Sequence, residues 1–507
     1  MVGIAERAQH AGVRGVAFSR WRVLVLLSGC AGIALHVWVY RSAIGVPVSD
    51  DGVVGLMALH ALHGHFTTFF WGQAYGGSQE ALLTVPVFWI FGPSWLALYI
   101  VPMALTACTS VVLWLVGRRL FGESAGILAG ALFWVWPPFA VYELTHQRGF
   151  YAADVLYTAL LLLLALRVVE RPDRLRVGLL GLVLGLAYWQ SSQIVPVAVP
   201  IVAWTIWKQP RCLRHLWVAV PLAALGALPW ILYNVHHDWA SITSLSQGQS
   251  SYAHRLRVFV SPLLPMALGL RATWTQERLL PALLTYLLLA ALLAAFVYGG
   301  LRAMRTEASL LYLVLVAFPF IYAISAWTYT ESEPRYLMAL MPVLALLVAQ
   351  LARSFPVAVL LLGCAVAVSV VNLQRMNTYE LRPETYPPAN RSMAGLVSTL
   401  DRLRVDRVYA GYEIAYRLDF DTHERIVAVM NESPLRLAHG QVTPEPTPGS
   451  IRWPAYDRLV RGALHAFVFY RQAVPTSTVV PVLRRDGYRS YPAGPYVVYV
   501  PAGVSPA

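Results

Sequence analysis

Two adjacent carboxylates, Asp50 and Asp51, are the residues of this chain best placed to do chemistry. They follow a long apolar run, so they stand where the chain would leave a membrane. Acids are also favoured in the first turn of a helix, because the helix dipole stabilises negative charge there. That explanation accounts for one acid well, whereas two adjacent acids flanked by apolar residues are less expected. A carboxylate in this position could serve as a general base or as a charged anchor.

Other ionisable residues lie near the ends of later apolar runs. Arg335 would either extend its charge to the membrane surface or bind phosphate oxygens in bidentate fashion. Asp154 would either begin a helix or contact a substrate, and His146 and Arg148 lie just before it in sequence. Two acids alone do not make a metal site, so no cofactor is predicted, although a divalent cation that bridges carboxylate and phosphate is compatible with them.

The composition indicates which environment must position these residues. The chain has 507 residues, of which 57% are hydrophobic and 13% charged. Soluble domains carry about 25% charged residues, so the chain is predicted to lie in a lipid bilayer. Its net charge is +13. The basic residues cluster in short loops between apolar runs, which is typical of cytoplasmic membrane loops rather than of a nucleic-acid surface.

Apolar runs predict a polytopic helical bundle over residues 1–373. A helix needs about 20 residues to cross a hydrocarbon core of about 30 Å. By this measure the sequence predicts about eleven transmembrane helices, with edges uncertain by several residues. They cover 22–40, 96–117, 124–142, 152–169, 176–191, 194–208, 215–233, 280–300, 308–327, 335–353 and 355–373.

Loop charges predict the orientation of this bundle. With a cytoplasmic N-terminus, every even-numbered connection carries Lys or Arg, as the positive-inside rule requires. These connections hold Arg118–Arg119, Arg167 to Arg176, Lys208 to His215, Arg302 with Arg305, and Arg353. The long loops 41–95 and 234–279 then face outward. The chain is therefore predicted to be a multi-pass plasma-membrane protein whose C-terminal region is extracytoplasmic.

The C-terminal region, residues 374–507, is predicted to form a small α/β domain. Strand-like runs occupy 407–410, 466–470 and 496–500, and helix signals appear at 391–404. In the first outer loop, Ser49 is a suitable N-cap for a helix lying in the membrane interface. The overall fold class is thus mainly α, with a C-terminal α/β domain.

Four stretches resemble a known family. Three of them resemble the first outer loop of bacterial GT-C glycosyltransferases, in the protein-mannosyltransferase and aminoarabinose-transferase group. They are Ser49–Ala58, Gly64–Phe66 and Phe70–Ala81. The usual Asp-Glu pair of that loop reads Asp50–Asp51 here. Glu333–Leu337, followed by Pro342, is similar to a late helix start in the same group.

The resemblance implies an enzyme that moves a hexosyl or pentosyl group from a polyprenyl-phosphate donor to an acceptor hydroxyl, with inversion, on the extracytoplasmic face. It implies that Asp50 is the general base, with Asp51 orienting it or holding the acceptor. Arg335 and Arg148 would bind the donor phosphate. The remaining expected substrate contacts are Asp154, Glu333, Tyr336, His146, Tyr75 and Gln73.

Three other functions remain open at this point. A transporter or flippase of a lipid-linked saccharide would place ionisable residues near span centres, whereas the charges here gather at span ends. A ligase or polymerase of surface polysaccharide would share the lipid-linked substrate. A scaffold protein would depend on its C-terminal domain and not on Asp50.

Overall fold

A computed structural model describes residues 2–243, 250–325, 330–352, 354–385, 387–430, 436–438, 441–443, 451–477 and 479–504, with backbone alone for 2–19, 436–438 and 441–443. The chain forms two compact units. The first comprises Met1–Tyr40, Pro102–Thr145 and Tyr151–Met376. The second comprises Arg41–Val101, His146–Phe150 and Asn377–Ala507.

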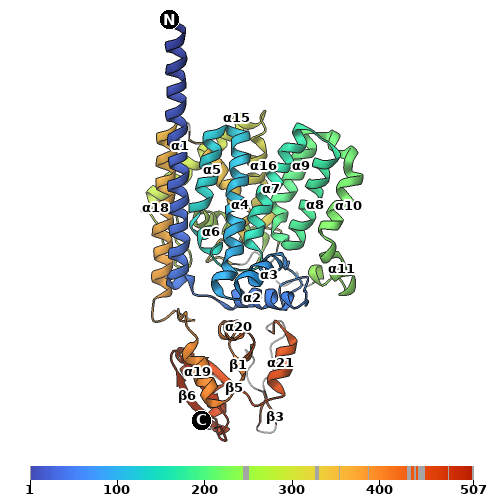
Figure 1. The fold of residues 1–507 in the computed structure, drawn as a ribbon, viewed down its shortest axis with the longest axis vertical. Helices are drawn as coiled ribbons and strands as arrows, with labels where there is room; N and C mark the ends of the chain where they lie inside the picture. The colour runs from blue at the N-terminus through green and yellow to red at the C-terminus, as the bar shows by residue number, and fades with distance from the viewer. Residues whose placement is uncertain are drawn as a thin grey trace. The chain divides into compact units, whose positions relative to one another are not determined.

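Five of the described helices are long and apolar enough to cross a membrane. They are Arg20–Arg41 within α1 (Val2–Arg41), α4 (Trp95–Phe121), α7 (Tyr151–Glu170), α15 (Ala282–Ala303) and α18 (Phe355–Glu380). A sixth span is possible where Pro210–Gly226, which includes α10 (Leu216–Gly226), is followed by α11 (Leu228–His236) at an angle of 63°. These helices run along the helical unit in Figure 1.

Each of the other predicted spans also contains a helix, but a shorter one. They are α5 (Glu123–Val135), α8 (Arg174–Gln190), α9 (Val195–Lys208), α16 (Ser309–Tyr322) and α17 (Met341–Ala349), the last preceded by a 3-10 turn at Arg335–Leu340. Proline explains the break after α5, because Pro137 follows Trp136 in an extended conformation. Residues 326–327 and 353 of two predicted spans lie outside the described residues. The mainly helical class with five or six spans is confirmed, and the count of eleven is not.

Small residues allow the helices of the first unit to approach closely. A Cβ atom at Gly185 of α8 would lie 2.0 Å from the carbonyl oxygen of Ala223 in α10. Such close backbone approach is typical of membrane helix pairs. Around this pair, α8 also packs on α7, and α9 packs on α7 and α16. Four shorter helices complete the unit: α6 (Pro138–Glu143), α12 (Ala240–Thr243), α13 (Tyr252–Val258) and α14 (Leu264–Ala267).

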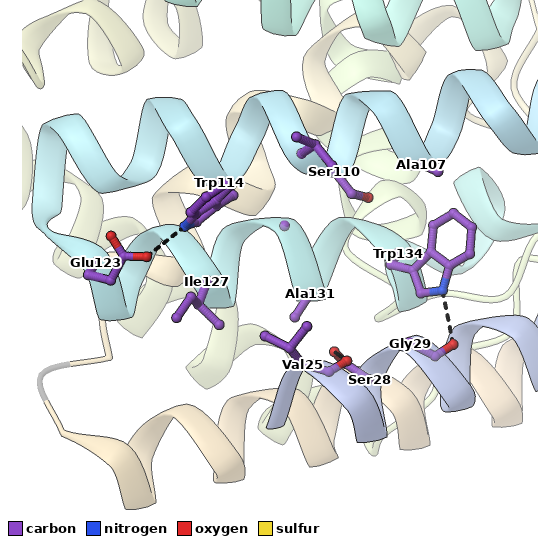
Figure 2. Close-up of a pocket in the computed structure, with 12 residues that line it drawn as sticks. Val25, Ser28, Gly29, Ala107, Ser110, Trp114, Glu123, Ile127, Ala131 and Trp134 are labelled. Carbon is purple, nitrogen blue, oxygen red and sulfur yellow. Dashed lines mark hydrogen bonds between the residues drawn. The ribbon is translucent and has the colours of Figure 1, made fainter. Parts of the chain in front are cut away.

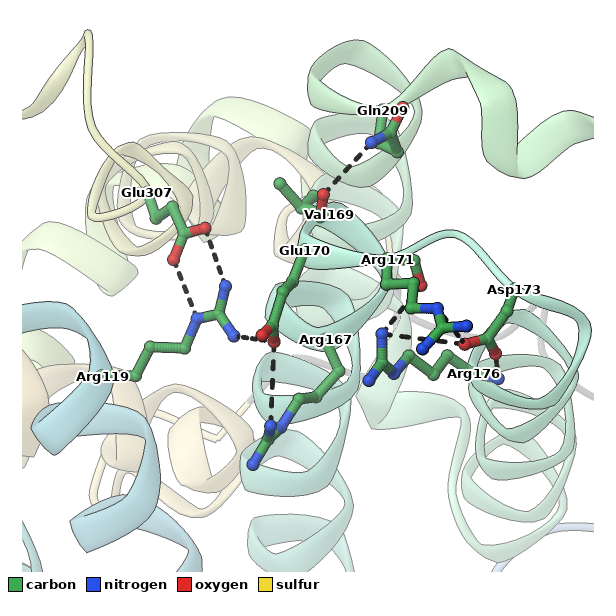
Figure 3. Close-up of polar contacts among 9 residues, drawn as sticks. All are labelled: Arg119, Arg167, Val169, Glu170, Arg171, Asp173, Arg176, Gln209 and Glu307. Atoms are coloured by element: carbon green, nitrogen blue, oxygen red, sulfur yellow. Dashed lines mark hydrogen bonds and ion pairs between the residues drawn. The ribbon is translucent and has the colours of Figure 1, made fainter.

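Polar residues in and beside the basic loops predicted to be cytoplasmic form separate groups of contacts, which Figure 3 shows. Arg119, at the end of α4, donates two hydrogen bonds of 2.9 Å to Glu307. It donates a third, of 2.6 Å, to Glu170 at the end of α7. Beside it, Asp173 caps α8 by accepting a 2.9 Å hydrogen bond from the backbone of Arg176. One guanidinium therefore links three segments of the bundle.

Replacing Arg119 by Ala is expected to destabilise the first unit by about 1 kcal/mol, which is the upper range for partly exposed ion pairs. The reason is that bidentate pairing holds the guanidinium in a fixed geometry. Thermal unfolding of the purified protein would measure this loss. Arg171→Ala is the control, because its exposed side chain reaches only Asp173, at 3.7 Å. Equal melting temperatures for both variants would contradict the linking role of Arg119.

The second unit contains a five-stranded sheet of order β2-β1-β5-β7-β6. β1 pairs in parallel with β2 and β5, whereas β7 is antiparallel to β5 and β6. The strands are β1 (Arg407–Ala410), β2 (Val427–Met430), β5 (Ala466–Tyr470), β6 (Arg489–Ala493) and β7 (Tyr496–Val500), and a separate hairpin comprises β3 (Arg436–Ala438) and β4 (Gln441–Thr443). The three predicted strands are confirmed, as is the predicted helix, which is α19 (Ala394–Leu403). Strands β2, β3, β4 and β6 were not predicted from the sequence.

Helices α2 (Ser49–Leu62) and α20 (Tyr412–Asp421) pack against each other in this unit. A Cβ atom at Gly52 would lie 2.4 Å from the carbonyl oxygen of Tyr416, and one at Gly55 would lie 2.5 Å from the ring of Phe420. A larger residue would have to displace the α20 backbone at Gly52 and the Phe420 ring at Gly55. The N-terminal turn of α2, which carries the two acids, is thereby held against α20. The unit also contains α3 (Gln79–Phe91), α21 (Pro454–Arg461) and α22 (Val480–Arg485).

Candidate functional site

Asp51 is a buried anchor in the first turn of α2. Its side chain has 0% exposure. One carboxylate oxygen accepts a 2.8 Å hydrogen bond from the backbone N–H of Val48, and the other accepts one of 2.8 Å from that of Gln147. Val48 is the N-cap of α2, so the prediction of Ser49 as N-cap was wrong by one residue. Ser49 instead donates its hydroxyl hydrogen to the carbonyl oxygen of Tyr412.

Two basic side chains lie close to the Asp51 carboxylate. His146 Nδ1 lies 3.4 Å from it, and Arg148 Nη1 lies 3.9 Å from it. Burial alone would favour the neutral acid, but the charges of Arg148 and His146 outweigh burial and hold the pKa of Asp51 below its ordinary value of 3.8. His146 is fixed in turn, because its Nε2 lies 2.9 Å from the carbonyl oxygen of Ile44. Asp51 therefore holds the His146–Arg148 segment in place.

Asp50 has different surroundings from Asp51. It is half-buried, and it accepts a hydrogen bond from the Tyr412 hydroxyl at the start of α20. Burial, followed by the negative charge of Asp50, raises the pKa of Tyr412 well above 10.0. Tyr412 therefore stays protonated at neutral pH and remains a hydrogen-bond donor. Arg452 Nε donates to the same hydroxyl at 3.2 Å, so an acid, a phenol and a guanidinium form one chain.

Further polar groups complete the surroundings of Asp50. The backbone N–H of Ser49 donates to Glu413 at 3.4 Å. Burial, and then the charge of Asp50, raises the pKa of Glu413 above its ordinary 4.5. Gln73, with its amide oxygen turned toward Arg452, accepts a 2.7 Å hydrogen bond from that guanidinium. The guanidinium also lies 5.2 Å from the ring of Phe70.

The two acids are thus adjacent in sequence but differ in what they can do. Both Asp51 oxygens already accept hydrogen bonds, and no part of that side chain is exposed. Asp50 is only half-buried, and Tyr412 orients it. Among the described residues, no group of three His, Cys, Asp or Glu side chains is arranged to hold a metal ion. Of the two adjacent acids, Asp50 is the one that is partly exposed.

A second polar cluster lies in the first unit, around Arg335. Glu333 forms an ion pair with Arg335 and accepts a 3.2 Å hydrogen bond from Trp274 Nε1. The Arg335 side chain is 41% exposed, so part of the guanidinium is accessible. Glu143 and Tyr151 lie within electrostatic reach of it. Arg335 therefore pairs with Glu333 on one side, while another part of its side chain remains exposed.

The structure brings some of the predicted residues together. The second unit contains Asp50, Asp51, His146, Arg148 and Gln73. It also contains Tyr75, which lies half-buried in the loop that follows α2. In the first unit, Glu333 pairs with Arg335, Tyr336 follows it in the same 3-10 turn, and Asp154 is buried in the first turn of α7.

Sequence reasoning missed four residues of these clusters: Tyr412, Glu413 and Arg452 in the second unit, and Glu143 in the first. The first three lie more than 350 residues from the acids in sequence, so no local spacing could connect them. Glu143 did carry a signal, because an acid at the end of an apolar run is a candidate functional residue.

Comparisons with known proteins show what the chain is similar to. Residues 81–233 match the family model described as dolichyl-phosphate-mannose-protein mannosyltransferase. The structure is similar to that of ArnT from Cupriavidus metallidurans in the apo state, with a TM-score of 0.63 and 15% identity over 97% of this chain and 100% of that one. ArnT from the same organism bound to undecaprenyl phosphate gives a TM-score of 0.59 and 16% identity over 94% of this chain and 97% of that one. No match was found among curated proteins.

These matches and the apolar helices support a multi-pass membrane protein. The chain has the fold of ArnT throughout nearly its whole length. The predicted resemblance to the protein-mannosyltransferase and aminoarabinose-transferase group of the GT-C glycosyltransferases is thereby confirmed.

Proposed function

We propose that this protein is an integral-membrane glycosyltransferase that moves a hexosyl or pentosyl group from a polyprenyl-phosphate donor to an acceptor hydroxyl. The single observation that carries the proposal is Asp50, a half-buried carboxylate oriented by Tyr412 within a fold shared with ArnT. The related ArnT structure bound to undecaprenyl phosphate supports a lipid-linked donor. The basic loops favour a cytoplasmic N-terminus and an extracytoplasmic site.

In the proposed reaction, Asp50 accepts the proton of the acceptor hydroxyl while that oxygen attacks the anomeric carbon of the donor sugar. The bond from the anomeric carbon to the phosphate oxygen breaks, and polyprenyl phosphate leaves with the electron pair. A single displacement of this kind inverts the anomeric configuration. Tyr412 orients Asp50 and excludes rotamers that would turn the carboxylate away. Asp51 acts through position alone, by fixing the segment that carries His146 and Arg148.

The leaving phosphate needs positive charge nearby, because charge develops on its oxygen as the bond breaks. Arg335 is the proposed contact, since its partly exposed guanidinium can bind phosphate oxygens in bidentate fashion. Arg148 is the second proposed contact, although its side chain is only 12% exposed and already neutralises Asp51. The other proposed substrate contacts are Asp154, Glu333, Tyr336, His146, Tyr75 and Gln73.

The test is turnover of a panel of polyprenyl-phosphate sugars by the purified protein, with and without a chelator. Consumption of at least one donor, together with release of polyprenyl phosphate, is the expected result. Loss of turnover with chelator would add a divalent cation to the reaction. Movement of an intact lipid-linked saccharide across proteoliposomes without cleavage would instead identify a flippase. Consumption only of lipid-linked oligosaccharides would identify a ligase or polymerase.

Tyr412→Phe is expected to lower kcat about tenfold, because a hydrogen bond to a charged group contributes about 1.5–3 kcal/mol. The KM for the donor and the melting temperature should change little, since the ring remains in place. Steady-state kinetics and thermal unfolding of the same preparation measure both. A variant that loses stability and keeps kcat would show that Tyr412 is a structural residue and does not position Asp50.

A further inference from the structure

A groove of about 420 Å³ lies on the first unit between α1, α4 and α5. Figure 2 shows its walls, which are formed almost entirely by apolar and small side chains. Two of the three helices, α1 and α4, are long and apolar enough to cross a membrane. A groove between such helices is expected to face lipid. Its volume falls in the range of about 300–1,000 Å³ that is typical of ligand sites.

Two tryptophans define the ends of this groove. At one end, Trp134 Nε1 donates to the carbonyl oxygen of Gly29 at 3.3 Å, and a Cβ atom at Gly32 would lie within the Trp134 ring. Helices α1 and α5 therefore touch there, which closes the groove. At the other end, Trp114 Nε1 donates to Glu123 at 3.0 Å. Between these ends the helices leave a channel along their length (Figure 2).

The length of the groove matches one leaflet of a bilayer. Glu123 and Trp134 are eleven residues apart on α5, which corresponds to about 16 Å at a rise of about 1.5 Å per residue. Half of the hydrocarbon core measures about 15 Å. The groove thus runs from the membrane surface beside Glu123 to about mid-membrane at Trp134. Loop charges predict that the Glu123 end is cytoplasmic, because it adjoins Arg118 and Arg119.

The Glu123 end of the groove carries an ion pair: Glu123 lines the groove, and Arg118 lies just outside the lining residues. Arg118 lies with its guanidinium carbon 4.9 Å from the centre of the Trp114 ring and its Nε 3.8 Å from Glu123. Its side chain is 46% exposed, so it can also reach a headgroup. A Lys or Arg near the membrane surface attracts anionic lipids with about 1 kcal/mol. Glu123 approaches the Arg118 guanidinium only at Nε, so the partly exposed Nη groups can donate to a lipid phosphate while the apolar wall holds an acyl chain.

We propose that this groove binds one acyl chain of an anionic glycerophospholipid from the cytoplasmic leaflet, with Arg118 beside the lipid phosphate. This site would be separate from the proposed donor site, because the lipid-linked sugar is expected in the outer leaflet. A polyprenyl chain is the alternative occupant. The contact of Trp134 with Gly29 and Gly32 argues against a polyprenyl chain, because this contact closes the end of the groove that faces the outer leaflet.

The test uses nanodiscs that contain phosphatidylglycerol with a photoactivatable acyl chain. In the wild-type protein, cross-links should map to peptides that contain Val25 or Ile127, both of which line the groove. Ile127→Trp should lower this labelling at least fivefold by filling the groove. Leu293→Trp on α15 is the matched control, because Leu293 is 64% exposed and lies outside the groove. Arg118→Ala should remove the preference for phosphatidylglycerol over phosphatidylcholine.

Three outcomes would overturn the proposal. The first is uniform labelling of all lipid-facing helices, which would mean that only bulk lipid touches the groove. The second is labelling that Ile127→Trp leaves unchanged. The third is displacement of the probe by polyprenyl phosphate at concentrations where phosphatidylglycerol has no effect. If Ile127→Trp does not fold, Val25→Trp can be used to fill the same groove from α1. The positions of the cross-links in the wild-type protein test the proposal without either variant.

Discussion

Asp50→Asn is expected to lower kcat for sugar transfer by about 10²–10⁴-fold, the range that a positioned general base contributes. The amide keeps the size of the side chain and can still accept a hydrogen bond from Tyr412, so packing against α20 should survive. It cannot take up the proton of the acceptor hydroxyl. Steady-state transfer from a polyprenyl-phosphate sugar would measure the loss.

Two controls separate this effect from damage to the fold. Asp401→Asn changes an exposed acid of the same unit, which pairs with Arg425 on the surface at 2.6 Å, and should leave kcat unchanged. The melting temperature of Asp50→Asn should also stay close to that of the wild type. Normal turnover by Asp50→Asn would remove this residue from the reaction.

Asp51→Ala is expected to destabilise the second unit by about 3–5 kcal/mol, because removing one partner of a buried ion pair leaves the other uncompensated. His146 and Arg148 would lose their carboxylate, and the N–H groups of Val48 and Gln147 would lose their acceptors. The His146–Arg148 segment should then detach from α2. Thermal unfolding and limited proteolysis near residue 147 would report both changes. A fully stable Asp51→Ala variant would contradict the anchor role.

The same anchor predicts a dependence of stability on pH. Because the folded protein holds the pKa of Asp51 below 3.8, its ionised form stabilises the fold at neutral pH. This contribution should be complete above about pH 5 and should decline as the pH falls through 3.8 toward the folded-state pKa. In the Asp51→Asn variant, the free energy of unfolding should lack the part of its decrease at low pH that comes from Asp51. Parallel acid-unfolding curves for wild type and variant would show that Asp51 makes no such contribution.

Periodicity and composition predicted the class of the fold because those signals are local. The apolar runs located a helix in every predicted span, and short runs of β-branched and aromatic residues located β1, β5 and β7. Helix lengths could not be predicted in the same way. Pro137 ends α5 early, and α10 and α11 meet at a break of 63°, so apolar runs of span length contain shorter helices.

The site was predictable only in part, for a related reason. Adjacent acids at a helix start are visible in sequence, so Asp50 and Asp51 were found together. Their different roles depend on partners that the fold supplies: Gln147 for Asp51, and Tyr412 with Arg452 for Asp50. Gly52 and Gly55 allow α20 to approach α2, which brings Tyr412 to Asp50. The sequence does not show which helix will pack against a glycine in another helix.

The role of Asp50 as the base of a transfer from a lipid-linked sugar is tested most directly by one measurement. Proteoliposomes that hold wild-type protein or Asp50→Asn are given a polyprenyl-phosphate monosaccharide and an acceptor, and release of polyprenyl phosphate is followed in time. The predicted result is release by the wild type and at least a hundredfold slower release by equally folded Asp50→Asn. Equal release by both proteins, or release by neither across the donor panel, would contradict the account.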